Sequence, residues 1–188
     1  MRNVHGTLVS AIVFAAVVIP GSAFAQQPAD CSTAPVPDRP LELSFGSQKI
    51  SALPFVKVNK IGGELSDGKL VSEQYQVSVQ DQDVFADVEV TFAVTVPAGQ
   101  RVDGKTFRTA PGGNLKQVLW SVKRKEPSLS ASFVGFSASI RVEFGKRGGD
   151  VLPGRVYLCV PGGQTEKMFG TKLPDPITLV GRFEAKIR

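Results

Sequence analysis

One segment of the chain matches a nucleotide-binding motif in both residue type and spacing. Residues 99–106 read Gly-Gln-Arg-Val-Asp-Gly-Lys-Thr, which is the G-x-x-x-x-G-K-[ST] pattern of a phosphate-binding loop. Such a loop works because a helix begins at its last residues and points its amide groups at the phosphates. Pro111 follows too closely for that helix to form. We therefore expect no nucleotide binding and interpret Asp103-Gly104 as a hairpin turn.

A second segment has the spacing found in penicillin-interacting enzymes. Ser66 and Lys69 are placed as in the S-x-x-K motif, in which both side chains lie on the first turn of a helix. The two residues between them, Asp67-Gly68, favour a tight turn instead. The chain also lacks the S-D-N and K-T-G partners of that motif. This match therefore predicts no acyl-transfer site.

Acidic residues gather between positions 81 and 89. Asp81 and Asp83 could offer oxygen ligands to calcium, but a calcium loop needs more ligands and a closing glutamate. Asp87 and Glu89 share one strand face, close to the carboxylate separation used in glycoside hydrolysis. Carboxylates on the outer face of a single strand are normally only solvated. We expect a solvated hairpin tip and no metal site, and a carboxylate-dependent hydrolase is the least favoured function.

The chain has one histidine, His5, and it lies in a segment that resembles a secretory signal peptide. Arg2 precedes an apolar run from Leu8 to Ile19, and Ala23-Phe24-Ala25 has the A-x-A form of a cleavage site. We predict that residues 1–25 are removed and that the protein is exported, to a periplasm or out of the cell. Removing His5 excludes histidine-based triads and metal sites. We therefore expect a protein that is not an enzyme and carries no cofactor.

Two cysteines, Cys31 and Cys159, are present. In an oxidising compartment, two cysteines favour one disulfide over two free thiols. The chain has no C-x-x-C pair, which redox proteins commonly use. The predicted bond is therefore structural.

Alternation of apolar and polar residues predicts strands throughout. Val84–Val96 has an apolar residue at every second position, residues 134–144 repeat the pattern, and residues 179–187 do so again. Gly- and Asp-rich turns separate these runs. We expect an all-β fold, an antiparallel two-sheet β-sandwich of about eight or nine strands. The alternative is a small closed β-barrel; as a membrane barrel it is disfavoured by mid-strand charges and by few Trp and Tyr residues.

The composition fits one domain. Residues 26–40 form a Pro-rich segment that we expect to be flexible, and residues 41–188 form a single β-sandwich domain. The predicted disulfide would tie this segment to a late strand.

Positive charge concentrates in the second half of a chain whose net charge is +5. If consecutive strands run antiparallel, their loops alternate between the two ends of the fold. The predicted order therefore brings several cations to one end, with Met168-Phe169 as an apolar tip in a long loop. These cations are Arg101, Lys123, Arg124, Lys125, Lys167 and Lys172.

The favoured function is an exported, non-catalytic binding module. Its basic end would recognise an acidic surface: an anionic glycan, the lipid headgroups of an anionic membrane surface, or an acidic protein. The alternative is a structural or assembly subunit that pairs by strand edges within an envelope or appendage complex. Nucleic acid is not expected as a partner, because the chain offers neither a reading helix nor stacking aromatic residues.

Overall fold

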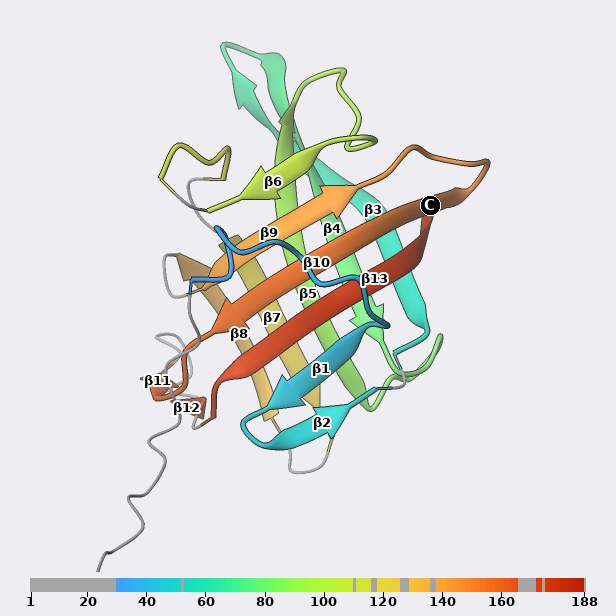
Figure 1. The fold of residues 1–188 in the computed structure, drawn as a ribbon. Coiled ribbons are helices and arrows are strands. Elements are labelled where there is room, and N and C mark those ends of the chain that lie inside the picture. Colours follow the sequence, from blue (N-terminus) through green and yellow to red (C-terminus); the bar gives the residue numbers. More distant parts are fainter. Residues whose placement is uncertain are drawn as a thin grey trace, which may run out of the picture.

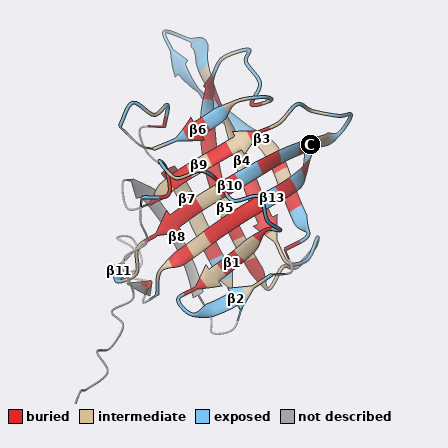
Figure 2. Cartoon of the chain, in the orientation of Figure 1, coloured by how far each residue is buried: buried red, intermediate tan, exposed pale blue. Residues whose placement is uncertain are grey.

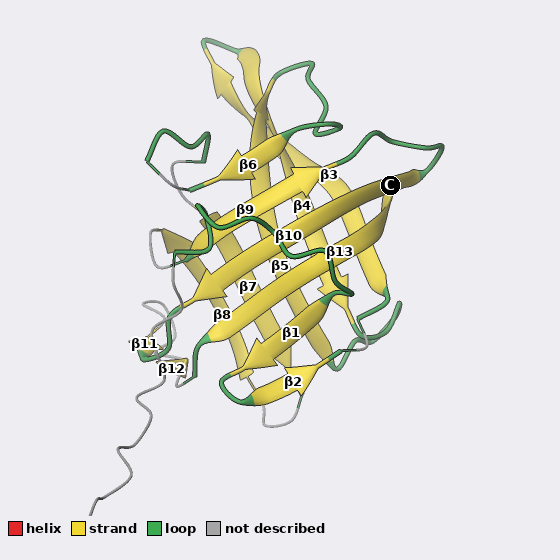
Figure 3. Ribbon diagram, in the orientation of Figure 1, coloured by secondary structure: helices red, strands yellow, loops and turns green. Residues whose placement is uncertain are grey.

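The computed structural model describes residues 30–51, 53–109, 111–115, 118–125, 129–135, 138–165, 172–173 and 175–187. All regular structure in these residues is β-strand, as the alternating pattern predicts (Figure 3). The described part of the chain accordingly has no helix with the length and apolar character needed to cross a bilayer.

Thirteen strands occur in the described residues. They are β1 (Glu42–Phe45), β2 (Gln48–Ile50), β3 (Phe55–Ser66), β4 (Lys69–Gln80), β5 (Val88–Pro97), β6 (Thr106–Arg108), β7 (Val118–Arg124), β8 (Leu129–Gly135), β9 (Ser139–Phe144), β10 (Val151–Val160), β11 (Gln164–Thr165), β12 (Lys172–Leu173) and β13 (Ile177–Ile187). This is more than the sequence suggested, since several short strands carry too few residues to show a period.

Eleven of these strands form one hydrogen-bonded sheet. Its strand order is β6-β9-β10-β13-β3-β4-β5-β7-β8, and β1 joins β13 on one side and β2 on the other. Figure 1 shows this sheet folded over itself, so that β9, β10 and β13 cross in front of β4, β5 and β7. β11 and β12 pair separately.

The two layers are joined by one short parallel pairing, which we call the seam. Ala185, Lys186 and Ile187 of β13 lie opposite Val56, Lys57 and Val58 of β3. The named strands pair antiparallel everywhere else in the described sheet. The expected pair of separate sheets is therefore not found in these strands. The closed-barrel alternative is wrong for them as well, because β6 and β8 stand at opposite ends of the order.

The buried apolar residues of the strands form one core. Figure 2 shows that buried positions recur along the strands of both layers. β5 shows how the sequence produces it, because Val90, Phe92 and Val94 are buried at alternate positions. The predicted strand at 84–96 begins later, at Val88, since the residues before it form a loop. The predicted strand at 134–144 is two strands, because β8 ends at Gly135 and β9 begins at Ser139, elsewhere in the sheet.

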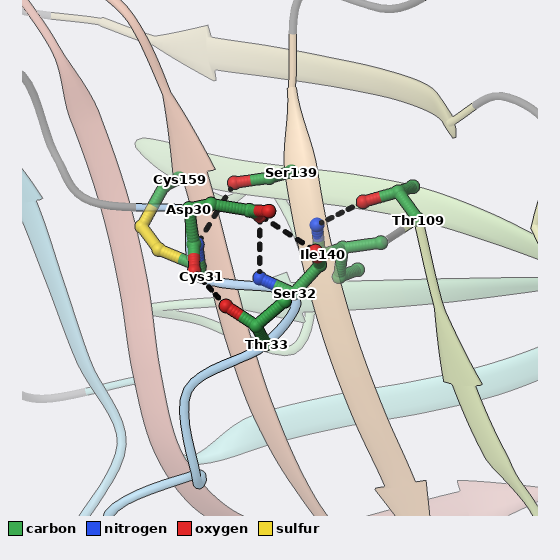
Figure 4. Close-up of a disulfide and its surroundings, with 8 residues drawn as sticks. All are labelled: Asp30, Cys31, Ser32, Thr33, Thr109, Ser139, Ile140 and Cys159. Carbon is green, nitrogen blue, oxygen red and sulfur yellow. Dashed lines mark hydrogen bonds between the residues drawn. A yellow bond between two sulfur atoms is a disulfide. The ribbon is translucent and has the colours of Figure 1, made fainter. Parts of the chain in front are cut away.

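Residues 30–40, which we call the strap, run across β10 and β13 (Figure 1). A disulfide joins Cys31 to Cys159 of β10, with the two Cα atoms 5.9 Å apart, as the sequence predicts (Figure 4). The amide of Cys31 donates to the hydroxyl of Ser139 on β9 at 3.1 Å. Both cysteines are buried. The strap is thus fixed to the sheet at its first residues.

The strap makes its second contact at Gly181 of β13. The amide of Arg182 donates to the carbonyl of Arg39 at 2.8 Å, and Pro40 forms a parallel bridge with Arg182. Gly181 has a φ of +135°, and a Cβ atom placed there would lie 2.5 Å from the carbonyl oxygen of Pro40. Only glycine lets the strap approach β13 so closely.

Gly181→Ala is expected to lower the free energy of unfolding by about 2–4 kcal/mol, because it combines backbone strain with a clash. Urea denaturation followed by circular dichroism measures the effect. Gly62→Ala is the matched control, since a Cβ at Gly62 meets no atom within 4 Å. Equal stability losses in the two variants would contradict this account of the strap.

Candidate functional site

The predicted basic end does not assemble as the loop-alternation rule suggested. In the register of β5 with β7, Val88 lies opposite Arg124 and Glu89 lies opposite Lys123. Lys123 and Arg124 therefore lie beside the first residues of β5, whereas Arg101 follows its last residue, Pro97. The rule failed because β6 does not lie between β5 and β7. β6 pairs with β9, and β5 and β7 pair directly and antiparallel, so the last residues of these two strands lie at opposite ends of the sheet.

The other predicted members of the basic end give less structural information. Lys167, Met168 and Phe169 lie outside the described residues. Lys172 belongs to β12, where it pairs with Thr165 of β11. The structure thus brings together Lys123, Arg124 and Lys125, and separates them from Arg101.

Two of the three adjacent cations have defined contacts. The guanidinium carbon of Arg124 lies 5.0 Å from the centre of the Phe45 ring, and its Nη2 donates to Oε1 of Gln48 at 2.5 Å. The amide of Lys125 donates to the carbonyl of Asp87 at 2.8 Å, and its Nζ lies 3.4 Å from Asp87 Oδ1. The basic segment is therefore attached to the loop between β4 and β5.

That loop, residues 81–87, carries the apolar tip that the sequence analysis missed. We call it the Phe85 tip. Phe85 is 90% exposed and Val84 is 63% exposed. Phe85 also has a φ of +57°, a left-handed conformation that is rare for a bulky side chain and costs energy. Phe55, which is 37% exposed, lies at the same end of the sheet, opposite Gln80.

The Phe85 tip is held by a side chain of β3 and by one of its own side chains, in addition to its contacts with Lys125. Lys57 of β3 places its Nζ 2.8 Å from both Oδ1 and the carbonyl oxygen of Asp83. Asp81 Oδ1 accepts hydrogen bonds from the amides of Asp87 and Val88 at 3.1 and 3.2 Å. The side chain of Lys57 is only 15% exposed, so its ion pair with Asp83 is partly shielded from water. These contacts fix a strained loop in one conformation.

The motifs that suggested enzyme chemistry have structural roles. Thr106, the last residue of the phosphate-loop match, begins strand β6, and the amide of Gly104 donates to the carbonyl of Gly145. Asp67 and Gly68 both have positive φ, as expected for the tight turn between β3 and β4. Glu89 accepts a hydrogen bond from Gln80 at 3.0 Å.

A groove of about 920 Å³ runs beside the strap. It is lined by the strap, β9, β10, β13 and the chain before β3. Its arginines engage an acid within the groove, because Asp38 lies 3.8 Å from Arg155 and 3.5 Å from Arg182. The lining also contains Glu143 and Glu184, so the carboxylates in the groove balance its two arginines and leave no excess of positive charge for an acidic ligand.

No family model, curated protein or solved structure matches this chain. Its function must therefore be inferred from the geometry of its own residues.

At the opposite end of β4 from the Phe85 tip, Glu73 is held as a carboxylate. Lys60 Nζ lies 2.8 Å from its Oε1, and the Tyr75 hydroxyl donates to its Oε2 at 3.3 Å. The hydrogen bond from Lys60 is the largest cause that lowers the pKa of Glu73, against a smaller opposing effect of desolvation. The same hydrogen bond raises the pKa of Lys60.

Because the folded state lowers the pKa of Glu73, its ionised form stabilises the fold at neutral pH, and this stability is lost as the pH falls through the lowered pKa. Glu73→Gln should therefore melt a few degrees below the wild type at pH 7, and the difference should shrink below pH 4.5. Thermal unfolding from pH 3 to pH 7 measures it. Glu64→Gln, at an exposed position on the same hairpin, is the control. A difference independent of pH would refute the role of the charge.

Proposed function

We propose that this protein is a non-catalytic binding module that docks onto an acidic protein through the Phe85 tip. The observation that carries the proposal is the combination of 90% exposure and left-handed backbone at Phe85 in a braced loop. A strained conformation persists only where the surrounding contacts maintain it, and such strain clusters at functional sites.

The apolar residues would supply most of the binding energy. Val84 and Phe85 project without apolar neighbours to cover them, so a partner that buries them removes their apolar surface from water. Because Lys57, Asp81 and Asp83 already fix the loop, little conformational entropy is lost on docking. A rigid aromatic anchor of this kind is typical of the residues that dominate protein interfaces.

The neighbouring cations support an acidic partner. Lys123 and Lys125 are exposed beside the tip, and the chain carries a net charge of +5. Nearby acids partly offset the charges of these lysines, because Asp87 lies beside Lys125 and Glu89 lies opposite Lys123. We therefore assign them a steering role, with a dependence on salt.

A protein partner is favoured over a membrane or a glycan by the bracing of the loop. A fluid bilayer accepts an aromatic ring in many orientations, so it gains little from one fixed conformation. A glycan offers little apolar surface to cover Val84 and Phe85. A fixed ring is useful where the partner has a shaped apolar socket.

Photo-cross-linking tests the proposal. Benzoylphenylalanine in place of Phe85 should give a discrete, protease-sensitive adduct in the native host. The same group in place of Leu65, which is 67% exposed near the end of β3 and opposite Leu70 of β4, should not give this adduct. Lipid adducts only, identical adducts from the two positions, or no adduct would each overturn the proposal.

The partner identified in this way should bind Phe85→Ala roughly ten- to a hundredfold more weakly, the loss expected for one buried phenylalanine. Leu65→Ala is the control and should bind as the wild type does. Lys123→Ala with Lys125→Ala should have a smaller effect that decreases with salt. Isothermal titration calorimetry measures all three, and unchanged affinity of Phe85→Ala would contradict the assignment.

We also propose that the protein is exported after removal of residues 1–25. The disulfide between Cys31 and Cys159 supports this, because such bonds persist in oxidising compartments. Intact-mass analysis of protein from the native host should give a chain that begins at Gln26. A chain that retains Met1 in a reducing cytosol would contradict it.

A further inference from the structure

Strand β8 lies at one end of the strand order in the described sheet, and its own sequence carries neither the charges nor the prolines that usually protect an edge. Among the residues that the structure describes, it pairs only with β7, from Val118↔Gly135 to Arg124↔Leu129 and without a register shift, and no described strand covers its other side. An unpaired strand edge offers a row of amide and carbonyl groups to any other strand. Natural proteins normally protect such edges with charges, prolines, bulges or short length.

The edge at β8 differs from the other edges of the described sheet. β6 and β2 have three residues each, and each carries a cation. β8 has seven residues, Leu-Ser-Ala-Ser-Phe-Val-Gly, with no charge and no proline. A long, uncharged and regular edge is suited to strand addition.

The sequence of β8 is also complementary to itself. If two copies pair antiparallel with Ser132 opposite Ser132, each large residue meets a small one. Leu129 then lies opposite Gly135, Phe133 opposite Ala131, and Val134 opposite Ser130. Alternation of large and small residues at facing positions is what lets side chains pack without clash or void.

We infer that β8 is a docking surface for a second copy of this chain, paired antiparallel about a two-fold axis at Ser132. The same seven residues then serve on both sides of the interface, as a two-fold dimer requires. The β8 strand of the second protomer then pairs with the free edge of the first, and the sheet continues from one protomer into the other. This inference goes beyond the Phe85 tip and does not depend on it.

Register-specific cross-linking tests the inference in the full mature protein with its native disulfide. Ser132→Cys should form a disulfide-linked dimer on mild oxidation, because opposite residues in an antiparallel pair have Cβ atoms about 4.5–5.5 Å apart. Ser130→Cys is the matched control. Two residues at position 130 would be separated by about 13 Å along the strands, so this variant should not cross-link. Peptide mapping identifies the new bond.

The two cysteine variants are comparable because their register partners lie on the same face of β7. Ser132 pairs with Ser121 and Ser130 pairs with Lys123, whereas buried Trp120 and Val122 alternate with these partners on the other face. Equal cross-linking of Ser132→Cys and Ser130→Cys, or none by either, would overturn the inference.

Light scattering gives the second measurement. The wild type should have twice the monomer mass at high concentration, and Ser132→Lys should be monomeric, because two lysines would meet on the axis. Ser47→Lys places the same charge in an exposed turn and should remain dimeric. A monomeric wild type at all concentrations, or a dimeric Ser132→Lys variant, would refute a dimer through β8 and leave the Phe85 tip unaffected.

Discussion

The arrangement of the whole molecule depends on the seam, where three residues of β13 pair in parallel with three residues of β3. β13 also pairs with β10 along its length, with β1 near its beginning and with the strap at Arg182. One strand therefore connects the front layer, the back layer and the disulfide-bonded strap. One face of the seam packs into the core, since Val56, Val58 and Ala185 are buried, whereas Lys186 is exposed on the other face.

Much of the secondary structure follows from the sequence, but the pairing of strands does not. The period of two in Val90, Phe92 and Val94 marks the face that β5 turns to the core. Asp67-Gly68 marks a tight turn, because that turn requires positive φ. Such patterns determine which face of a strand is buried, but they do not determine which other strand it pairs with. Nothing in residues 185–187 or 56–58 marks them as parallel partners.

The candidate site was less accessible to sequence reasoning for a related reason. Val84 fits the alternation of the following strand, so the loop that presents Phe85 looks like the start of that strand. The loop is held in place by Lys57, more than twenty positions earlier, which forms an ion pair with Asp83. The sequence did identify Lys123 and Lys125, but their position beside the tip follows from the register of β5 with β7. Neither the ion pair of Lys57 with Asp83 nor the pairing of β5 with β7 can be recognised from residues that are neighbours in the sequence.

The seam has a kinetic consequence as well. Most strand pairs in this sheet join segments close in sequence, whereas the seam, the pairing of β1 with β13 and the disulfide each close a loop of more than a hundred residues; the disulfide spans 128. Closing such loops has a large entropic cost before any contact repays it, so distant pairings form late in folding. Once the strap is oxidised onto β10, the start of β3 is tethered near β13. The covalent bond thus shortens the conformational search for these distant pairings.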